Sequence, residues 1–315
     1  MKNKNKFIIG RLLMVIGLLI PLLSLTTICV NDMKKKSDYE NFVEKESTIS
    51  NEEREKLKSE IERYNGRVQG IEPGLVDPFT GTDFKARYNI KGEDDEAFSY
   101  IRIPKIDVTL PVYLGASYRH LSMGAAHVDG TSLPVGGEGT RSVIAGHRGF
   151  YKDTMFLNLH ELEKDDMIIL RREDDIMFYK VTDSEVINPY DWDKLEVLDK
   201  EDMLTLLTCD PITPPSPYRL IVNAKRYYPP QKENVKNTLV KIESEQISSN
   251  VKNVKMGVYA ATILMWALLI YITVDTILKL KNYKDAGYVA MIDDEEDAAE
   301  NSETGENKPY TNKEN

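Results

Sequence analysis

Three side chains in this sequence have the chemistry needed for acyl transfer. Cys209 ends the apolar run Leu-Thr-Leu-Leu-Thr-Cys and precedes Asp-Pro, which is typical of a strand that delivers a thiol to the rim of a domain. His147 lies in Ala-Gly-His-Arg-Gly after another apolar run, so its imidazole can serve as general acid and base. Arg219 begins a third apolar run. Taken singly, each has an ordinary alternative: an inert buried cysteine, a turn histidine, a solvated strand-end arginine.

The spacing of Cys209 and Arg219 adds to this pattern. The intervening residues 211–217 are rich in proline and predict a connecting loop, so the flanking strands should pair antiparallel and return Arg219 close to Cys209. A guanidinium there can hydrogen-bond a developing oxyanion or a peptide carbonyl. A neighbouring imidazolium favours the thiolate, and the set suits acyl transfer through a thioester. No aspartate or asparagine that would orient His147 is identifiable, so a papain-like triad has no positive support.

Short β-rich runs must position these residues. After Ala97 they alternate with glycine and proline turn signals, and no regular helix separates them. This texture indicates a sandwich or a closed barrel, and we predict a mainly β fold with one closed β-barrel over residues 97–230. Short helices are expected near 118–123 and 200–203. The candidate strands are Tyr100–Ile103, Val108–Tyr113, Ser142–Ala145, Met167–Leu170, Ile176–Val186, Leu204–Thr208 and Arg219–Ala224.

An N-terminal helix and a loop precede this barrel. Ser50 with Glu53 forms a capping-box pattern, and apolar residues then recur at helical spacing to Val68, predicting an amphipathic helix to about Tyr64. It either packs against the body or lifts it from the membrane as a stalk. Residues 70–81 have glycine or proline every few positions and read as a loop.

Two uncharged apolar segments bracket the body. Residues 12–31 and 256–274 are each long enough to cross a bilayer. A cleaved signal peptide is the alternative for the first, but no suitable cleavage site follows it. Lysine bias places both termini in the cytoplasm and the body outside. The expected parts are 1–31 (N-terminus and span), 32–96 (helix and lid loop), 97–230 (barrel), 231–254 (linker), 255–280 (span) and 281–315 (acidic, disordered tail).

Composition excludes several functions. The net charge of −10 does not suit a nucleic-acid-binding protein. Two cysteines rule out a disulfide-stapled fold, and four histidines show no zinc-ligand spacing, so we predict neither cofactor nor metal. The acidic residues 165–166 and 173–175 read as solvated turns rather than as a calcium site.

The run from Thr205 to Cys209 resembles the Thr-Leu-x-Thr-Cys signature of the sortase family, and His147 and Arg219 fall where that family has its histidine and arginine. The resemblance covers roughly residues 38–228. It implies that Cys209 is the nucleophile, His147 the acid and base, and Arg219 the stabiliser of substrate and oxyanion.

Within sortases the sequence is most similar to class C, the pilin polymerases. The stretch 124–149, with Gly-His-Arg-Gly at its end, resembles the class C segment leading to the histidine, and terminal spans on both sides are typical of that class. Asp77, Pro78 and Phe79 match its Asp-Pro-aromatic lid motif. The resemblance implies that the aspartate lies near Arg219 and the aromatic ring near Cys209. From the residues alone, Asp-Pro-Phe reads as an ordinary turn. The proline-rich loop 210–217 and the acidic tail depart from the pattern.

The resemblance implies a membrane-anchored cysteine transpeptidase. It would cleave a Leu-Pro-x-Thr-Gly-like sorting signal of a pilin or surface protein and join the acyl group to a lysine amine of another pilin. Its partners would be those proteins and membrane lipid. The alternatives are a cell-wall-anchoring sortase with the same chemistry and a non-enzymatic membrane-anchored adhesion or sensor protein.

Overall fold

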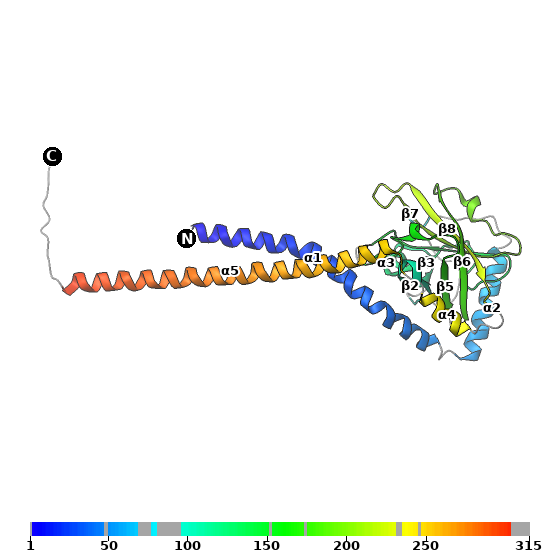
Figure 1. The fold of residues 1–315 in the computed structure, drawn as a ribbon, viewed down its shortest axis with the longest axis horizontal. Coiled ribbons are helices and arrows are strands. Elements are labelled where there is room, and N and C mark those ends of the chain that lie inside the picture. Colours follow the sequence, from blue (N-terminus) through cyan, green and yellow to red (C-terminus); the bar gives the residue numbers. More distant parts are fainter. Residues whose placement is uncertain are drawn as a thin grey trace. The chain divides into compact units, whose positions relative to one another are not determined.

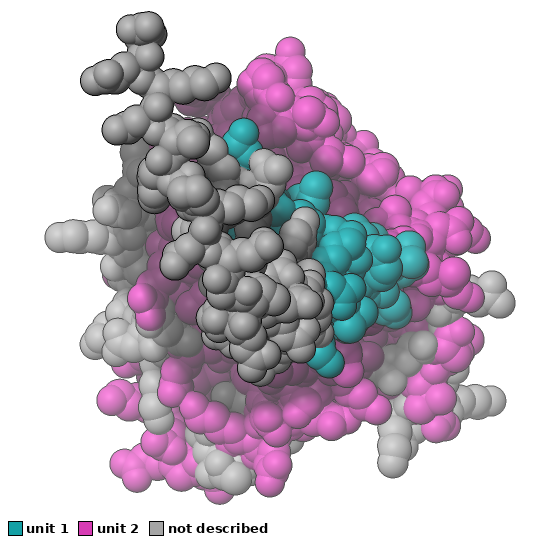
Figure 2. Space-filling view, turned by 90° about the vertical axis from the view of Figure 1, so that its left-hand side faces the viewer, with its two compact units in different colours: residues 1–23, 260–315 teal, residues 24–259 magenta. Residues whose placement is uncertain are grey.

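The computed structural model describes residues 2–46, 50–68, 77–80, 96–150, 153–172, 175–230, 235–244 and 247–303 (Figure 1). The chain divides into two compact units, residues 1–23 with 260–315 and residues 24–259 (Figure 2). The first unit contains parts of two long helices, α1 (Lys2–Glu46) and α5 (Ser249–Glu303), which are joined there by an ion pair between Arg11 and Asp275. The second unit contains the barrel.

Eight strands form a closed barrel in the order β1-β2-β3-β4-β7-β8-β6-β5, with β1 pairing β5 to close it. This confirms the predicted fold class. The pairs β2–β3 and β4–β7 are parallel and the others antiparallel. The strands are β1 (Ser99–Ile103), β2 (Val108–Leu114), β3 (Ala125–His127), β4 (Thr140–Ala145), β5 (Met167–Arg172), β6 (Asp175–Ile187), β7 (Asp202–Asp210) and β8 (Tyr218–Tyr227).

Two local expectations are corrected by the barrel. Strand β3 was not predicted, because three residues are too few to show alternation. The helix expected over 200–203 is absent: Asp202 opens β7, and Met203 pairs with both neighbouring strands. Pairing with the strands on both sides overrides the local preference of these residues for a helix. The short helix near 118–123 is present as α3 (Tyr118–Met123).

The barrel interior is a continuous apolar core. Along β2 buried and half-buried residues alternate, as expected when one face of a strand points inward. Ile101, Ile144, Leu206 and Val222 come from four different strands and have no exposed surface. Burying each such side chain contributes roughly 1.5–3 kcal/mol. The ends of β4, β7 and β8 are therefore held on a rigid frame.

Helix α2 (Asn51–Val68) packs against the barrel unit and is not a free stalk. Its capping box is formed: the Ser50 backbone N–H donates to the Glu53 carboxylate and the Glu53 N–H donates to Ser50 Oγ, each at 3.3 Å. The Tyr64 hydroxyl donates to Asp129 at 3.3 Å, in the loop that leads to β4. The helix ends one turn later than predicted.

Two helices follow the barrel. Helix α4 (Val235–Glu243) lies in the segment expected to be a linker, next to the barrel (Figure 1). Its Leu239 and Ile242 pack against residues of β5 and β6. Helix α5 continues to Glu303, whereas the sequence predicted a disordered tail from residue 281. Alanine, glutamate and lysine favour helix, and extending a formed helix avoids the nucleation cost. Residues 304–315 lie outside the described part.

Two segments of the described helices are long and apolar enough to cross a membrane. They are Asn5–Lys45, with a mean hydropathy of 2.5 in its most apolar window, and Ser249–Asn282, with 2.0. Only 11% and 6% of these windows are buried within the protein, so packing inside the chain does not account for their apolar surface.

Candidate active site

Cys209 and Arg219 face each other across two strands. In the antiparallel pair β7–β8, Cys209 is directly opposite Arg219, as the loop spacing predicted. Side chains at directly opposed positions have Cβ atoms about 4.5–5.5 Å apart. The Cys209 side chain is half-buried and its thiol is free.

Strand β4 brings His147 to the same rim. Ala145 pairs with Leu207 in the parallel β4–β7 ladder, so His147 and Cys209 each lie two residues beyond a paired position. Gly146 continues the ladder: its N–H donates to the Leu207 carbonyl at 3.0 Å, and its carbonyl accepts from Thr208 Oγ1 at 2.7 Å.

Aromatic rings surround the His147 imidazole. Phe150 stacks on it, with ring centroids 4.9 Å apart and planes 5° from parallel. Tyr118 meets it edge-on at 6.5 Å and Phe79 lies 5.9 Å away. Within the described residues, buried Nε2 has no hydrogen-bond partner. Burial lowers the pKa of His147, because the charged form loses its hydration, and so favours a neutral imidazole.

Asp77 holds the Arg219 guanidinium in a two-point ion pair. Nε donates to Oδ1 at 3.1 Å and Nη2 donates to Oδ2 at 2.5 Å. Both side chains are buried, at 7% exposure for Arg219 and 2% for Asp77. Nη1 donates to the backbone carbonyls of Ser216 at 3.0 Å and Tyr218 at 2.7 Å, which fixes the plane of the fork. In this closed arrangement Nε, Nη1 and Nη2 of Arg219 all donate to atoms of the protein itself.

Phe79 lies between the guanidinium and the imidazole. Its ring is 5.2 Å from the Arg219 guanidinium carbon and packs against the apolar cluster around Leu207. Asp77 Oδ1 accepts the Phe79 N–H at 3.2 Å, so one carboxylate both shapes the turn and binds the arginine. The structure thus places Asp77 against Arg219, as the resemblance implies, and brings Phe79 near Arg219 and His147.

Arg148 was missed by the sequence reasoning. Its Nη1 donates to the Cys209 carbonyl at 3.1 Å and forms an ion pair with Asp210, and its side chain is only 7% exposed. The signal that would have found it is its place beside His147 between two glycines. It ties the His147 loop to the end of the strand that carries the thiol.

Competing effects act on the thiol. Burial raises the pKa of Cys209, the Arg219 guanidinium lowers it, Asp77 raises it and Arg148 lowers it, with burial the largest effect. The net direction is upward, so the closed site favours a neutral thiol.

Within the described ranges no cluster of three or more histidine, cysteine, aspartate or glutamate side chains is arranged to hold a metal ion. His127 lies apart from the site: it is buried, and its Nε2 lies 3.1 and 3.0 Å from the carbonyls of Thr131 and Ser132. Burial lowers the pKa of His127 to about 4.

The fold and the site together define a closed eight-stranded β-barrel that carries a thiol, an imidazole and a guanidinium at one rim. The sortase-domain family model matches residues 101–227, and two solved sortases aligned over 95% or more of their length are at least 32% identical to the chain. The chain belongs to the sortase family and is a sortase enzyme.

Its structural neighbours are class C pilin sortases. Sortase C-3 from Streptococcus pneumoniae is 34% identical, with a TM-score of 0.58, and the match covers 67% of this chain and 98% of that one. Sortase C1 of GBS Pilus Island 1 is 32% identical, with a TM-score of 0.56, and the match covers 64% and 95%. Sortase D from Bacillus subtilis is 28% identical over 144 residues, 45% of this chain and 70% of that protein.

Proposed function

We propose that this sortase is a membrane-anchored transpeptidase that joins pilin subunits, with Cys209 as nucleophile, His147 as acid and base, and Arg219 as stabiliser of the oxyanion. The observation that carries the assignment is the direct cross-strand pairing of Cys209 with Arg219 beside the strand that ends at His147. A planar guanidinium opposite the sulfur is suited to an oxygen that gains charge when the thiolate attacks.

The reaction has two balanced steps. The Cys209 sulfur attacks the threonine carbonyl of a Leu-Pro-x-Thr-Gly-like signal, the threonine–glycine C–N bond breaks, and His147 gives a proton to the leaving glycine amine. A lysine amine of another pilin then attacks the thioester and gives a proton to His147. The C–S bond breaks, Cys209 leaves as thiolate, and an isopeptide bond forms.

The closed site is at rest. Burial raises the pKa of Cys209 and lowers that of His147, so both groups favour their neutral forms. Attack therefore requires the thiol proton to move to His147 when substrate enters. An open Arg219 stabilises the resulting thiolate by charge, which it does less well while Asp77 neutralises it.

Asp77, Pro78 and Phe79 form the lid over this site. The Asp77 carboxylate occupies the donors that a substrate oxygen would use, and the Phe79 ring fills the space between Arg219 and His147. Pro78 restricts the backbone of the turn. Substrate must displace all three, so the lid competes with substrate for the site.

The division of the chain follows from the two apolar helices. We place one span within residues 1–31 and one within 255–280, which is supported by an apolar helix long enough to cross a membrane at each place. In this proposal the catalytic body lies outside, both termini lie in the cytoplasm and membrane lipid surrounds the spans. In intact cells, a membrane-impermeant thiol reagent should label Cys209 in a Phe79→Ala variant, while a tag on the C-terminus should resist added protease. Degradation of the tag in intact cells would exclude this orientation.

The decisive experiment incubates the full chain in detergent micelles with sorting-signal peptides and reads the intact mass, with Cys209→Ala as control. A thioester adduct found only with Cys209 present supports the assignment. Lysine-bearing and glycine-bearing acceptor peptides then compete for the adduct. Preferred capture by the lysine side chain supports pilin joining, and preferred capture by a glycine amine indicates the anchoring type. No adduct, even with Phe79→Ala, contradicts the proposal.

A further inference from the structure

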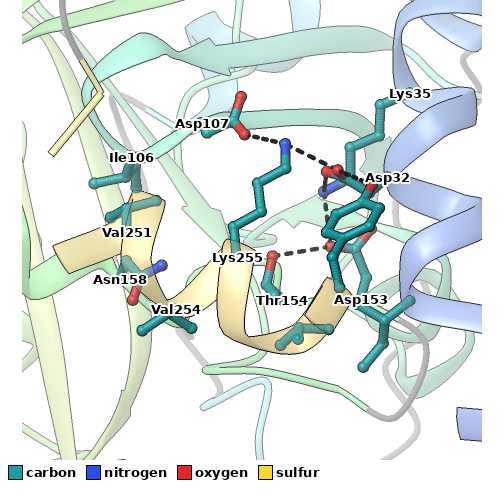
Figure 3. Close-up of a pocket in the computed structure, with 13 residues that line it drawn as sticks. Asp32, Lys35, Ile106, Asp107, Asp153, Thr154, Asn158, Val251, Val254 and Lys255 are labelled. Carbon is teal, nitrogen blue, oxygen red and sulfur yellow. Dashed lines mark hydrogen bonds and ion pairs between the residues drawn. The ribbon is translucent and has the colours of Figure 1, made fainter. Parts of the chain in front are cut away.

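A group of charged residues, here the juxtamembrane ion cluster, joins both long helices to the barrel. It consists of Asp32 and Lys35 on α1, Lys255 on α5, Asp107 after the turn η1 (Pro104–Ile106), and Asp153 in the loop between β4 and β5 (Figure 3). The Lys255 ammonium lies 2.9 Å from Asp32 and 2.5 Å from Asp107. The Lys35 ammonium lies 3.0 Å from Asp153 and 3.7 Å from Asp32.

The cluster surrounds a cavity of about 40 Å³. This volume admits a few water molecules and no larger ligand. Figure 3 shows the lysine side chains reaching toward the carboxylates, so both ammonium groups are already paired within the protein. The arrangement therefore fits a clamp rather than a binding site.

Asp153 shapes the loop that follows His147. Its Oδ1 accepts the Met155 N–H at 2.9 Å, and its backbone exchanges two hydrogen bonds with Phe150, at 2.8 and 3.1 Å. Met155 has a φ of +44°, which is uncommon for a residue with a side chain, and it is buried. Such a conformation persists only where surrounding contacts hold it.

Two residues of this loop contact His147, one at its imidazole ring and one at its backbone carbonyl. The Phe150 ring stacks on His147 at 4.9 Å, and the Phe156 N–H donates to the His147 carbonyl at 3.0 Å. Phe156 also fills the space beside Gly146. A loop that relaxes would move the ring that covers His147.

Lys35 supplies the charge that keeps Asp153 in place. The two side chains are only 14% and 13% exposed, so each is largely removed from water. Without the ammonium, a mostly buried carboxylate would lose its cation and turn toward solvent. The hydrogen bond from the Met155 N–H depends on the position of that carboxylate, and the backbone pairing of Asp153 with Phe150 lies directly beside it.

We propose that Lys35 is a positioning residue of the sortase reaction: through Asp153 it holds the loop that orients His147, so the membrane-proximal part of α1 belongs to the active-site machinery. The effect on turnover rests on the role proposed above for His147. The effect on the loop does not.

The test uses the full chain in detergent micelles and compares Lys35→Met with Lys36→Met and Lys35→Arg. Lys36 is a matched control because its side chain is 85% exposed and lies 3.8 Å from Glu40. For turnover of a sorting-signal peptide through the Cys209 thioester, Lys35→Met should lower kcat roughly tenfold with KM nearly unchanged, since small displacements of catalytic groups are costly. Lys35→Arg should restore most of the rate, and Lys36→Met should match the unsubstituted chain.

Amide hydrogen exchange gives the second measurement, independent of turnover. Exchange across 153–158 should be faster in Lys35→Met than in Lys36→Met, with the barrel strands unchanged. Asp153→Asn should lower kcat as Lys35→Met does. The double variant should lose no more activity than either single variant, because each substitution breaks the same Lys35–Asp153 contact.

Equal kcat in Lys35→Met and Lys36→Met overturns the proposal, as does a rate loss without faster exchange in the loop. General loosening of the barrel in Lys35→Met would make Asp153→Asn the deciding variant. If the unsubstituted chain forms no thioester, the proposed function fails, while the exchange comparison still decides whether Lys35 holds the loop.

Discussion

Replacing Asp77 by alanine should open the active site. Asp77 is 2% exposed and binds Arg219 through two hydrogen bonds, at 3.1 and 2.5 Å. In the open state water can solvate both charges, so the substitution removes what favours the closed state over the open one. A hydrogen bond to a charged group contributes about 1.5–3 kcal/mol, and we assign this amount to the pair as a whole.

That free energy sets the size of the effect. Since about 1.4 kcal/mol corresponds to a factor of ten, the open fraction should rise roughly 10- to 100-fold until the open state predominates. Labelling of Cys209 that proceeds through the open state should accelerate by the same factor. Asp77 also raises the pKa of Cys209, so its removal adds thiolate and acts in the same direction.

The assay measures the rate at which a thiol reagent modifies Cys209, from intact mass against time, across pH. Asp77→Ala should label faster and show its pH midpoint at lower pH than the unsubstituted chain. Phe79→Ala should also label faster, because the ring no longer fills the space near His147. Asp199→Ala, which removes an exposed carboxylate before β7, is the matched control.

An Asp77→Ala rate equal to that of Asp199→Ala would refute a closed lid held by Arg219. A faster rate with no change in the pH midpoint would retain the lid and refute the charge effect of Asp77 on the thiol.

Further predictions concern substitutions at five positions. His147→Ala and Arg219→Lys should each abolish thioester formation while circular dichroism stays unchanged, and normal turnover in either would refute its role. Arg148→Gln should raise the pH midpoint of Cys209 labelling, because a cation that lowers that pKa is lost; an unchanged midpoint would contradict this. Gly146→Ala should lower the thermal midpoint, since the new Cβ would lie 2.7 Å from the Phe156 ring, a clash costing roughly 1–3 kcal/mol. Burial lowers the pKa of His127 to about 4, so between pH 6.5 and 4 the unfolded chain binds a proton that the folded chain does not. The free energy of unfolding should therefore fall by about 3 kcal/mol as the pH falls from 6.5 toward 4. His127→Gln should flatten that decline in unfolding measurements.

The sequence predicted seven of the eight strands because each has a local signature. Apolar runs bounded by glycine and proline mark β1, β2, β4, β5, β6, β7 and β8. Strand β3 has no such signature: its three residues form a strand because β2 and β4 lie on either side of it. The same holds for Met203, which the barrel recruits into β7.

The site divides in the same way. The pairing of Cys209 with Arg219 was predictable because a short loop joins two strands and sets their register. The ion pair of Asp77 with Arg219 was reached only through a family resemblance, since 142 residues separate them. Arg148 stands beside His147 between two glycines, but its ion pair with Asp210 joins residues 62 positions apart, and nothing in the local sequence predicts that contact.

Local sequence features are enough to predict the closed barrel, the two apolar helices, and the thiol, imidazole and guanidinium of the site. These depend on periodicity, run length and loop length, which are properties of neighbouring residues. The contact of Lys35 with Asp153, 118 residues away, and the stacking of Phe150 on His147 were found in the folded structure and were not predicted. Such contacts depend on where closure of the barrel and docking of α1 bring distant surfaces together, and local sequence does not encode that geometry.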